Sequence, residues 1–171
     1  MNLSTLGQRY FRVARSLTGL GLFATREIPK KSRITRYRGP LLDHDEAVRI
    51  ENSGNRYLFE INDKWTVDGT ARSNVARYAN HSCNPNAEAY YYGKGIYIRS
   101  LRRIKAGEEI TYHYGMDYLR NVIGISNCRC GRCRRRKARK QREARARVKR
   151  LEARARKKRA EMRASKRRAR R

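Results

Sequence analysis

Residues 80–86 of this chain read Asn80-His81-Ser82-Cys83-Asn84-Pro85-Asn86. This segment places an amide, an imidazole and a thiol beside a turn that a proline stiffens. A second segment follows, Gly107-Glu108-Glu109-Ile110-Thr111-Tyr112-His113-Tyr114-Gly115, and it ends a strand-like run in two tyrosines one residue apart. Neither segment would be decisive alone, but both together, in this order and at this separation, are hard to obtain by chance. We call them the Asn-His segment and the tyrosine segment.

Composition divides the chain near residue 133. All aromatic residues, glycines, prolines and cysteines lie at or before Cys133. Residues 134–171, the basic tail, hold 22 Lys or Arg and three Glu among 38 residues, which is +19 of the chain's net charge of +29. A segment so charged and so poor in large apolar groups cannot bury a core. The fold therefore belongs to residues 1–133, a length that can hold one modest core.

Several classes of protein are disfavoured. No apolar run approaches the roughly 20 residues that span a bilayer, and the N-terminus lacks the apolar stretch of a signal peptide, so we expect no membrane partner. Three cysteines within six residues fit metal ligands in a reducing compartment better than a disulfide framework. We expect an intracellular location, in the cytoplasm or nucleoid of a bacterium or in the nucleus and chromosomes of a eukaryote.

The first 115 residues predict short strands joined by glycine-bearing turns. The expected strands are 9–14, 21–25, 33–37, 57–61, 65–68, 87–92, 95–100 and 109–112. A helix is expected over Asp43–Asn52, with Asp43 as its N-cap and Gly54 beyond its end. A helical turn is expected over Ser73–Tyr78, and Gly93 should supply the positive φ of a two-residue type II′ hairpin turn. The predicted class is α+β and mostly β.

The basic tail repeats with a nine-residue register marked by Glu143, Glu152 and Glu161. Its residues are strong helix formers, but repulsion between the cations outweighs i,i+4 pairs worth about 0.3 kcal/mol each. We therefore expect a partly helical or disordered tail that becomes ordered on a polyanion. A nine-residue period does not build one apolar face, so no coiled coil is expected.

Together, the Asn-His and tyrosine segments resemble the signature segments of the SET-domain protein-lysine methyltransferases. The resemblance runs from about Gly19 to Cys133, and it implies a fold of small curved sheets with a pseudoknot-like threading of the C-terminal segment. It divides the chain into a SET domain (1–118), a post-SET-like cysteine segment (119–133) and the basic tail (134–171). The implied reaction transfers a methyl group from S-adenosylmethionine to a lysine side chain. We expect a monomer.

The resemblance also implies where the cofactor binds. Residues 18–24 look like the family's glycine segment, where the backbone meets the methionine end of S-adenosylmethionine, although a glycine pair before a strand is otherwise an ordinary turn signal. Asn80 would contact the amino-acid end, and the backbone of His81 would contact the adenine. The implied cofactor-binding residues are Gly19, Leu20, Gly21, Asn80, His81 and Tyr114.

Three tyrosines are the implied catalytic residues. Tyr114 would place its hydroxyl where the lysine amine, the methyl group and the sulfonium meet. Tyr112 falls where the family carries Phe or Tyr, and a hydroxyl there can hold a water that crowds out further methyl groups, so mono- or dimethylation is expected. Tyr57 resembles a tyrosine that lines the lysine channel, although a tyrosine in a strand is otherwise ordinary core. His113 departs from the Asp usual between the two tyrosines.

The cysteines suggest a metal site. Cys128-Arg129-Cys130-Gly131-Arg132-Cys133 resembles the cysteine segment that follows many SET domains, although the family usually has more residues between the last two cysteines. In the family, three such cysteines and the cysteine of the Asn-His segment bind one Zn²⁺ as a tetrahedron. The implied ligands are Cys83, Cys128, Cys130 and Cys133. The alternative is a set of free thiols near the surface.

Two functions are open at this point. One is an active methyltransferase whose substrate, by family analogy, is a histone or a histone-like, nucleic-acid-associated protein. The other is a catalytically silent SET-like scaffold that binds nucleic acid. In either case the tail should bind polyanions with a steep salt dependence, through duplex contact rather than base stacking; docking on an acidic protein surface is the alternative. The presence of Tyr57, Asn80, His81 and Tyr114 favours the active enzyme.

Overall fold

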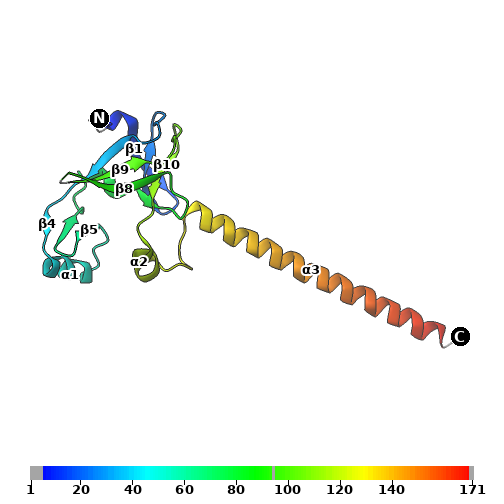
Figure 1. Ribbon diagram of the computed structural model, residues 1–171. Coiled ribbons are helices and arrows are strands. Elements are labelled where there is room, and N and C mark those ends of the chain that lie inside the picture. Colours follow the sequence, from blue (N-terminus) through cyan, green and yellow to red (C-terminus); the bar gives the residue numbers. More distant parts are fainter. Residues whose placement is uncertain (1–5, 94, 170–171) are drawn as a thin grey trace. The chain divides into compact units, whose positions relative to one another are not determined.

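The computed structural model describes residues 6–93 and 95–169. The chain forms two compact units, one that ends at Cys130 and one that begins at Gly131. Figure 1 shows the short strands of the first unit and the long helix of the second. No helix among the described residues combines the length and the apolar character needed to cross a membrane. The finer division of the chain at residues 118 and 133 stays a prediction.

Short strands dominate the first unit. They are β1 (Phe11–Ser16), β2 (Gly19–Ala24), β3 (Arg33–Tyr37), β4 (Leu41–Leu42), β5 (Leu58–Asn62), β6 (Trp65–Asp68), β7 (Asn80–His81), β8 (Ala87–Tyr92), β9 (Gly95–Ser100) and β10 (Glu109–Tyr112). The helical elements of this unit are η1 (Gln8–Tyr10), α1 (His44–Asn52), η2 (Val75–Tyr78), α2 (Met116–Tyr118) and the π-helical η3 (Leu119–Ile123). All eight predicted strands are present, five of them with the predicted bounds. The two-residue strands β4 and β7 were not predicted, because two residues carry no periodicity.

The local signals for the helices and the hairpin turn are also confirmed. The Asp43 side chain caps α1 by accepting a hydrogen bond from the backbone N–H of Glu46 at 2.9 Å. The predicted turn over 73–78 appears as η2. Gly93 has a φ of +56°, as the hairpin between β8 and β9 requires, while Lys94 lies outside the described residues.

Three sheets form the first unit, with the strand orders β1-β2-β10-β7, β3-β9-β8 and β4-β6-β5. Within the first sheet β10 is central. It pairs antiparallel with β2, where Ile110 faces Leu22, and parallel with β7, where Thr111 faces Asn80. One strand, β10, therefore brings together the glycine segment, the Asn-His segment and the tyrosine segment. The pseudoknot-like threading implied by the resemblance would also place these segments side by side.

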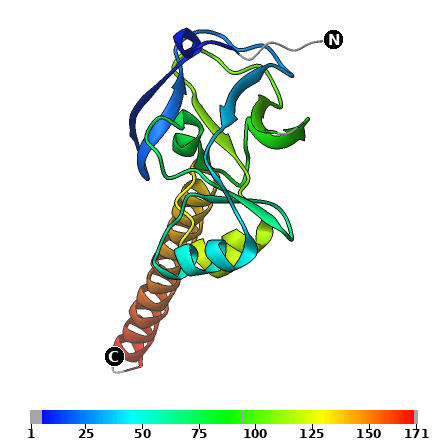
Figure 2. The same ribbon diagram turned by 90° about the vertical axis from the view of Figure 1, so that its left-hand side faces the viewer.

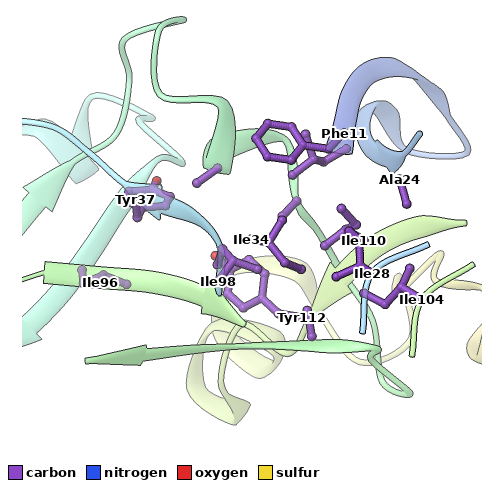
Figure 3. Close-up of a cluster of buried hydrophobic side chains, with 14 of the residues drawn as sticks. Phe11, Ala24, Ile28, Ile34, Tyr37, Ile96, Ile98, Ile104, Ile110 and Tyr112 are labelled. Carbon is purple, nitrogen blue, oxygen red and sulfur yellow. The ribbon is translucent and has the colours of Figure 1, made fainter. Parts of the chain in front are cut away.

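A core of branched aliphatic side chains supports β10 (Figure 3). Its fully buried members include Leu22, Ile28, Ile34, Ile98, Ile104 and Ile110. Each contributes on the order of 2 kcal/mol when removed from water. Figure 2 shows α1 and the α2 segment at the end of this unit away from β1 and β2. The core thus holds the site's strands in place from one side.

The second unit is the helix α3 (Gly131–Arg168). It is continuous, a greater extent of helix than expected, because good helix formers follow Gly131 without a Gly or Pro. Two of the glutamates pair with cations four residues before them, Arg139 with Glu143 at 3.5 Å and Lys157 with Glu161 at 4.0 Å. The described side chains from Arg134 onward are exposed.

Candidate active site

The tyrosine segment leaves β10 directly beside β7. Tyr112 ends the strand, and its ring centroid lies 4.7 Å from that of Tyr114. The ring of Tyr118, from α2, packs against the ring of Tyr114 in a T-shaped arrangement, with the ring centroids 5.5 Å apart. Phe59 of β5 lies parallel to Tyr112 at a centroid distance of 6.5 Å. These side chains form one aromatic cluster contributed by three elements.

Two hydrogen bonds hold Tyr114, one to His81 of the Asn-His segment and one to Ala79, which directly precedes that segment. Its hydroxyl donates to the carbonyl oxygen of Ala79 at 2.8 Å, and its backbone N–H donates to Nδ1 of His81 at 3.3 Å. Burial raises the pKa of the Tyr114 phenol, and nearby groups including Tyr118 add to the effect. Tyr112 is buried more deeply, and burial raises its pKa well above the ordinary value. Both hydroxyls are therefore neutral at physiological pH.

An open pocket of about 1030 Å³ lies beside this cluster. It is bounded by α1, β5 and the α2 segment, and Tyr57, Tyr112 and Tyr114 all line it. The predicted catalytic tyrosines therefore share one cavity. Two further lining residues, Arg77 and Tyr118, had no signal in the sequence, because each reaches the pocket only through tertiary packing.

Arg77 lies over the ring of Tyr57, with the guanidinium carbon 3.7 Å from the ring centroid. It also donates a hydrogen bond to the carbonyl of Thr70, while its Nε is buried and, among the described residues, has no hydrogen-bond partner. The Tyr57 backbone carbonyl accepts a hydrogen bond from the Tyr37 hydroxyl at 2.7 Å. Tyr57 is thus fixed on its ring face and at its backbone, with 37% of its surface exposed.

Several of the predicted cofactor residues meet beside β10. The Asn80 amide nitrogen donates to the Leu20 carbonyl at 3.0 Å and to Oε1 of Glu109 at 2.8 Å. Gly19 has a φ of +118° and open space where a Cβ would stand, and Leu20 is half exposed. The structure therefore brings Gly19, Leu20 and Asn80 together in one accessible region, which we call the cofactor edge.

His81 joins the cofactor edge to the cysteines. Its Nδ1 accepts from the Tyr114 backbone, and its Nε2 lies 3.3 Å from Sγ of Cys83. Burial, followed by the nearby His113, lowers the pKa of His81 to about 4. The ring is therefore neutral at physiological pH.

Asn86, the last residue of the Asn-His segment, locks the two signature segments together. It is buried, its Nδ2 donates to Oε1 of Glu108 at 3.0 Å and to the Glu109 carbonyl at 2.8 Å, and its Oδ1 accepts from the Thr111 N–H at 2.9 Å. This role of Asn86 is not apparent from the sequence. Its side-chain amide thus bonds to two backbone groups of β10, the Glu109 carbonyl and the Thr111 N–H.

The four cysteines form a compact thiol cluster. The sulfur atoms of Cys83, Cys128, Cys130 and Cys133 lie within 4.8 Å of one another. The Cys83 and Cys128 sulfurs are 3.9 Å apart. A zinc tetrahedron with Zn–S bonds of about 2.3 Å has sulfur separations of about 3.8 Å, so the four side chains fit one zinc ion. The short spacing between Cys130 and Cys133 does not prevent this approach.

Comparison with known proteins agrees with this geometry. Residues 19–115 match the protein family described as SET domain. The chain belongs to the SET-domain family. This match covers residues 19–24 of the glycine segment and all of the Asn-His and tyrosine segments, and it confirms the resemblance.

Its relatives are histone-lysine methyltransferases. It is 30% identical over 152 residues to histone-lysine N-methyltransferase mes-4 of Caenorhabditis elegans, covering 77% of this chain and 17% of that protein. It is 40% identical over 129 residues to histone-lysine N-methyltransferase 2D of Homo sapiens, covering 70% of this chain and 2% of that protein. The chain thus spans a small part of these relatives.

A solved structure, described as ctPRC2 in an autoinhibited conformation bound to S-adenosylmethionine, superposes with a TM-score of 0.59 and 30% identity. The match covers 66% of this chain and 16% of that one. The first unit therefore has a SET-domain fold, and the match takes up only a small part of that longer chain.

Proposed function

We propose that this SET-domain chain is an S-adenosylmethionine-dependent protein-lysine methyltransferase. The observation that carries the proposal is the position of Tyr114, which lines the pocket with Tyr57 and Tyr112 and bonds to Ala79 and His81, the residues on either side of Asn80. A cofactor at the edge and a lysine in the pocket would meet at Tyr114. The names of the relatives, and the cofactor bound in the similar structure, support this reading.

The cofactor would be held by the Gly19–Gly21 backbone, the side chain of Asn80 and the backbone of His81. The exposed Leu20 and the open space at Gly19 leave room for it. When bound, S-adenosylmethionine supplies a methyl group on a sulfonium, which is a good leaving group. The reaction is then an in-line displacement that needs no covalent protein nucleophile.

The pocket's task is to present a neutral amine. A lysine of pKa about 10.4 is neutral in about 1 of 2,500 molecules at pH 7, a cost of about 4.6 kcal/mol. The aromatic walls from Phe59, Tyr112 and Tyr118 desolvate the amine and so lower its pKa, and the sulfonium charge acts in the same direction. Because the hydroxyls of Tyr112 and Tyr114 stay neutral, no phenolate opposes this effect. Their oxygens can accept N–H bonds and aim the lone pair at the methyl carbon.

We infer that the cysteine cluster binds one structural zinc ion through Cys83, Cys128, Cys130 and Cys133. Four thiolates leave no open coordination position, so the ion would support folding rather than the reaction. It would tie the residues that follow the tyrosine segment to the Asn-His segment. This in turn would keep Tyr118 beside Tyr114.

The proposed substrate is a lysine of a histone or a histone-like, nucleic-acid-associated protein. The support is the activity in the names of the relatives and the basic tail, which carries +19 of the chain's net charge and whose residues 134–168 lie in α3. Such a tail would bind duplex phosphates without reading sequence. It would hold the enzyme where its substrates are bound to DNA, in chromatin if the chain is eukaryotic.

A second function has its own support. The exposed side chains and continuous charge of α3 would also suit a nucleic-acid-binding scaffold whose SET domain is silent. The contact of Tyr114 with both the pocket and the residues that flank Asn80 favours the enzyme, because a scaffold has no need of it.

A methyl-transfer assay tests the proposal. Labelled S-adenosylmethionine is offered with core histones, with a bacterial histone-like protein and with no added substrate. We expect label on a protein, lost with Tyr114→Phe. Absence of label on every protein, together with absence of cofactor binding by calorimetry, would favour the scaffold instead.

A further inference from the structure

Glu109 places a carboxylate between the β1–β2 hairpin and β7, beside the cofactor edge. Its Oε1 accepts a hydrogen bond from the Ser16 hydroxyl at 2.7 Å and from the Asn80 amide at 2.8 Å. Ser16 closes the β1–β2 hairpin opposite Gly19, and Asn80 begins β7. One oxygen atom at the start of β10 therefore ties together the hairpin of the glycine segment and the Asn-His segment.

The same carboxylate explains why residue 21 is a glycine. A Cβ at this position would stand 2.5 Å from Oε1 of Glu109 and 3.1 Å from the amide nitrogen of Asn80. From sequence, Gly21 was expected to allow the backbone close to the cofactor. In the structure its missing side chain makes room for Glu109, so Gly21 and Glu109 form one packing unit.

The consequence falls on the Asn80 amide. An amide NH₂ has two hydrogens, and here they have two acceptors, the Leu20 carbonyl at 3.0 Å and Glu109 at 2.8 Å. A flipped amide would set its oxygen against both of these acceptors with no hydrogen between them. Glu109 and the Leu20 carbonyl together therefore fix which end of the amide is the oxygen, and Glu109 is the partner that a substitution can remove. Oδ1 is left as an acceptor, in a known orientation.

We propose that Glu109 is a positioning residue for the cofactor's amino-acid end: it holds Asn80 so that Oδ1 accepts a hydrogen bond from the α-ammonium of S-adenosylmethionine. The inference rests on the proposed function, because it presumes that this cofactor binds beside Asn80. The Glu109 charge adds attraction for the same ammonium. An ammonium has donors and no acceptors, so only this amide orientation suits it.

The test is calorimetry on the full chain with two probes. S-adenosylhomocysteine carries the amino-acid end, and 5′-methylthioadenosine lacks it while keeping the adenosine. For Glu109→Ala we expect S-adenosylhomocysteine to bind about 10-fold or more weakly, as for loss of a hydrogen bond to a charged group. Binding of 5′-methylthioadenosine should change less than about twofold, because the adenosine does not meet Asn80. In turnover, the KM for S-adenosylmethionine should rise with a smaller change in kcat.

Two further variants make the result specific. Glu109→Gln keeps a carbonyl oxygen for Ser16 and Asn80, so it should recover most of the affinity that Glu109→Ala loses. Glu27→Ala removes an exposed carboxylate, paired with Arg103 at 3.7 Å and apart from this edge, and should bind both probes as the unchanged chain does. Thermal melting of each variant identifies any that fail to fold. If Glu109→Ala is one of them, Glu109→Ser, whose short side chain cannot reach Asn80 in the same way, takes its place with the same expected result.

The outcomes are distinct. Equal weakening of both probes, or unchanged binding of S-adenosylhomocysteine to a folded Glu109→Ala variant, would overturn the role of Glu109 and leave the cofactor site intact. Failure of the unchanged chain to bind either probe would overturn the cofactor assignment itself, and this inference with it.

Discussion

At the scale of single residues, the Tyr114 hydroxyl is the atom on which transfer should depend. It donates to the Ala79 carbonyl at 2.8 Å, which fixes its position, and its lone pairs remain to accept from an amine. We predict that Tyr114→Phe lowers kcat at least about 100-fold, a size typical for removal of one positioned polar group at a reacting centre. Cofactor affinity should stay within about twofold, and the free energy of unfolding should fall by about 1 kcal/mol.

Rate assays, calorimetry with S-adenosylhomocysteine and denaturant unfolding measure these three quantities. Tyr92→Phe is the matched control, because Tyr92 is half exposed and does not line the pocket. Loss of cofactor binding in Tyr114→Phe would mean that the hydroxyl belongs to the cofactor site instead.

A second residue-scale prediction concerns pH. Although burial opposes it, hydrogen bonds from Arg102, Asn86 and the Lys105 N–H lower the pKa of Glu108 from 4.5 to about 2. Because the pKa is lower in the folded state, ionised Glu108 stabilises the fold above about pH 4.5, and this contribution is lost as the pH falls towards 2. We predict that Glu108→Gln lowers the free energy of unfolding at pH 7 by on the order of 1 kcal/mol.

Thermal unfolding of both proteins at pH 7 and near pH 2 checks this prediction. The difference in Tm should be clear at pH 7 and should shrink in acid. A difference that is the same at both pH values would show that the charge of Glu108 is not the cause.

At the scale of elements, the segment after β10 depends on the thiol cluster. Cys128 and Cys130 are buried, and no other cysteine is available to replace them. We predict one bound zinc per chain, lost in Cys130→Ser because three thiolates hold the ion much more weakly. The Tm should fall by several degrees, since ion binding is linked to folding.

Elemental analysis and a colorimetric chelator measure the zinc content. Arg129→Ala changes the exposed residue between two of the cysteines and should keep the metal. A wild-type protein purified without any bound metal would contradict the site.

At the scale of the whole molecule, charge is carried unevenly. The basic tail holds +19 of +29, and its side chains are exposed in the described part of α3. We predict that the full chain binds a short DNA duplex and that its affinity falls about 10³-fold or more between 50 and 200 mM salt, as for six to ten phosphate contacts. A chain shortened after Arg136 should lose this binding and still methylate a short peptide.

Fluorescence anisotropy over a salt series measures the first effect, and the peptide assay measures the second. Replacing Glu143, Glu152 and Glu161 by Gln is the matched control, since it should strengthen binding. DNA affinity that survives the shortening would place the nucleic-acid site on the first unit.

Local sequence was sufficient for much of this description. The strand 95–100 and the caps around α1 each depend on neighbours a few residues away, and both elements are present. The tail was expected to be partly helical or disordered, whereas α3 is continuous from Gly131 to Arg168. The Asn-His and tyrosine segments also indicated the family, because an unusual run of polar and aromatic residues is recognisable without a fold. The four cysteines suggested a cluster, since few arrangements of them are possible.

Contacts between distant parts of the chain could not be predicted from local sequence. Glu109 lies 93 residues from Ser16 and 29 from Asn80, yet shares hydrogen bonds with both. Arg77 covers Tyr57, and Tyr118 meets Tyr114, only because η2, β5 and α2 converge on one pocket. Propensity and periodicity act over a turn or a strand, whereas these positions follow from how β10 pairs with β2 and β7 and from how the core packs beneath them.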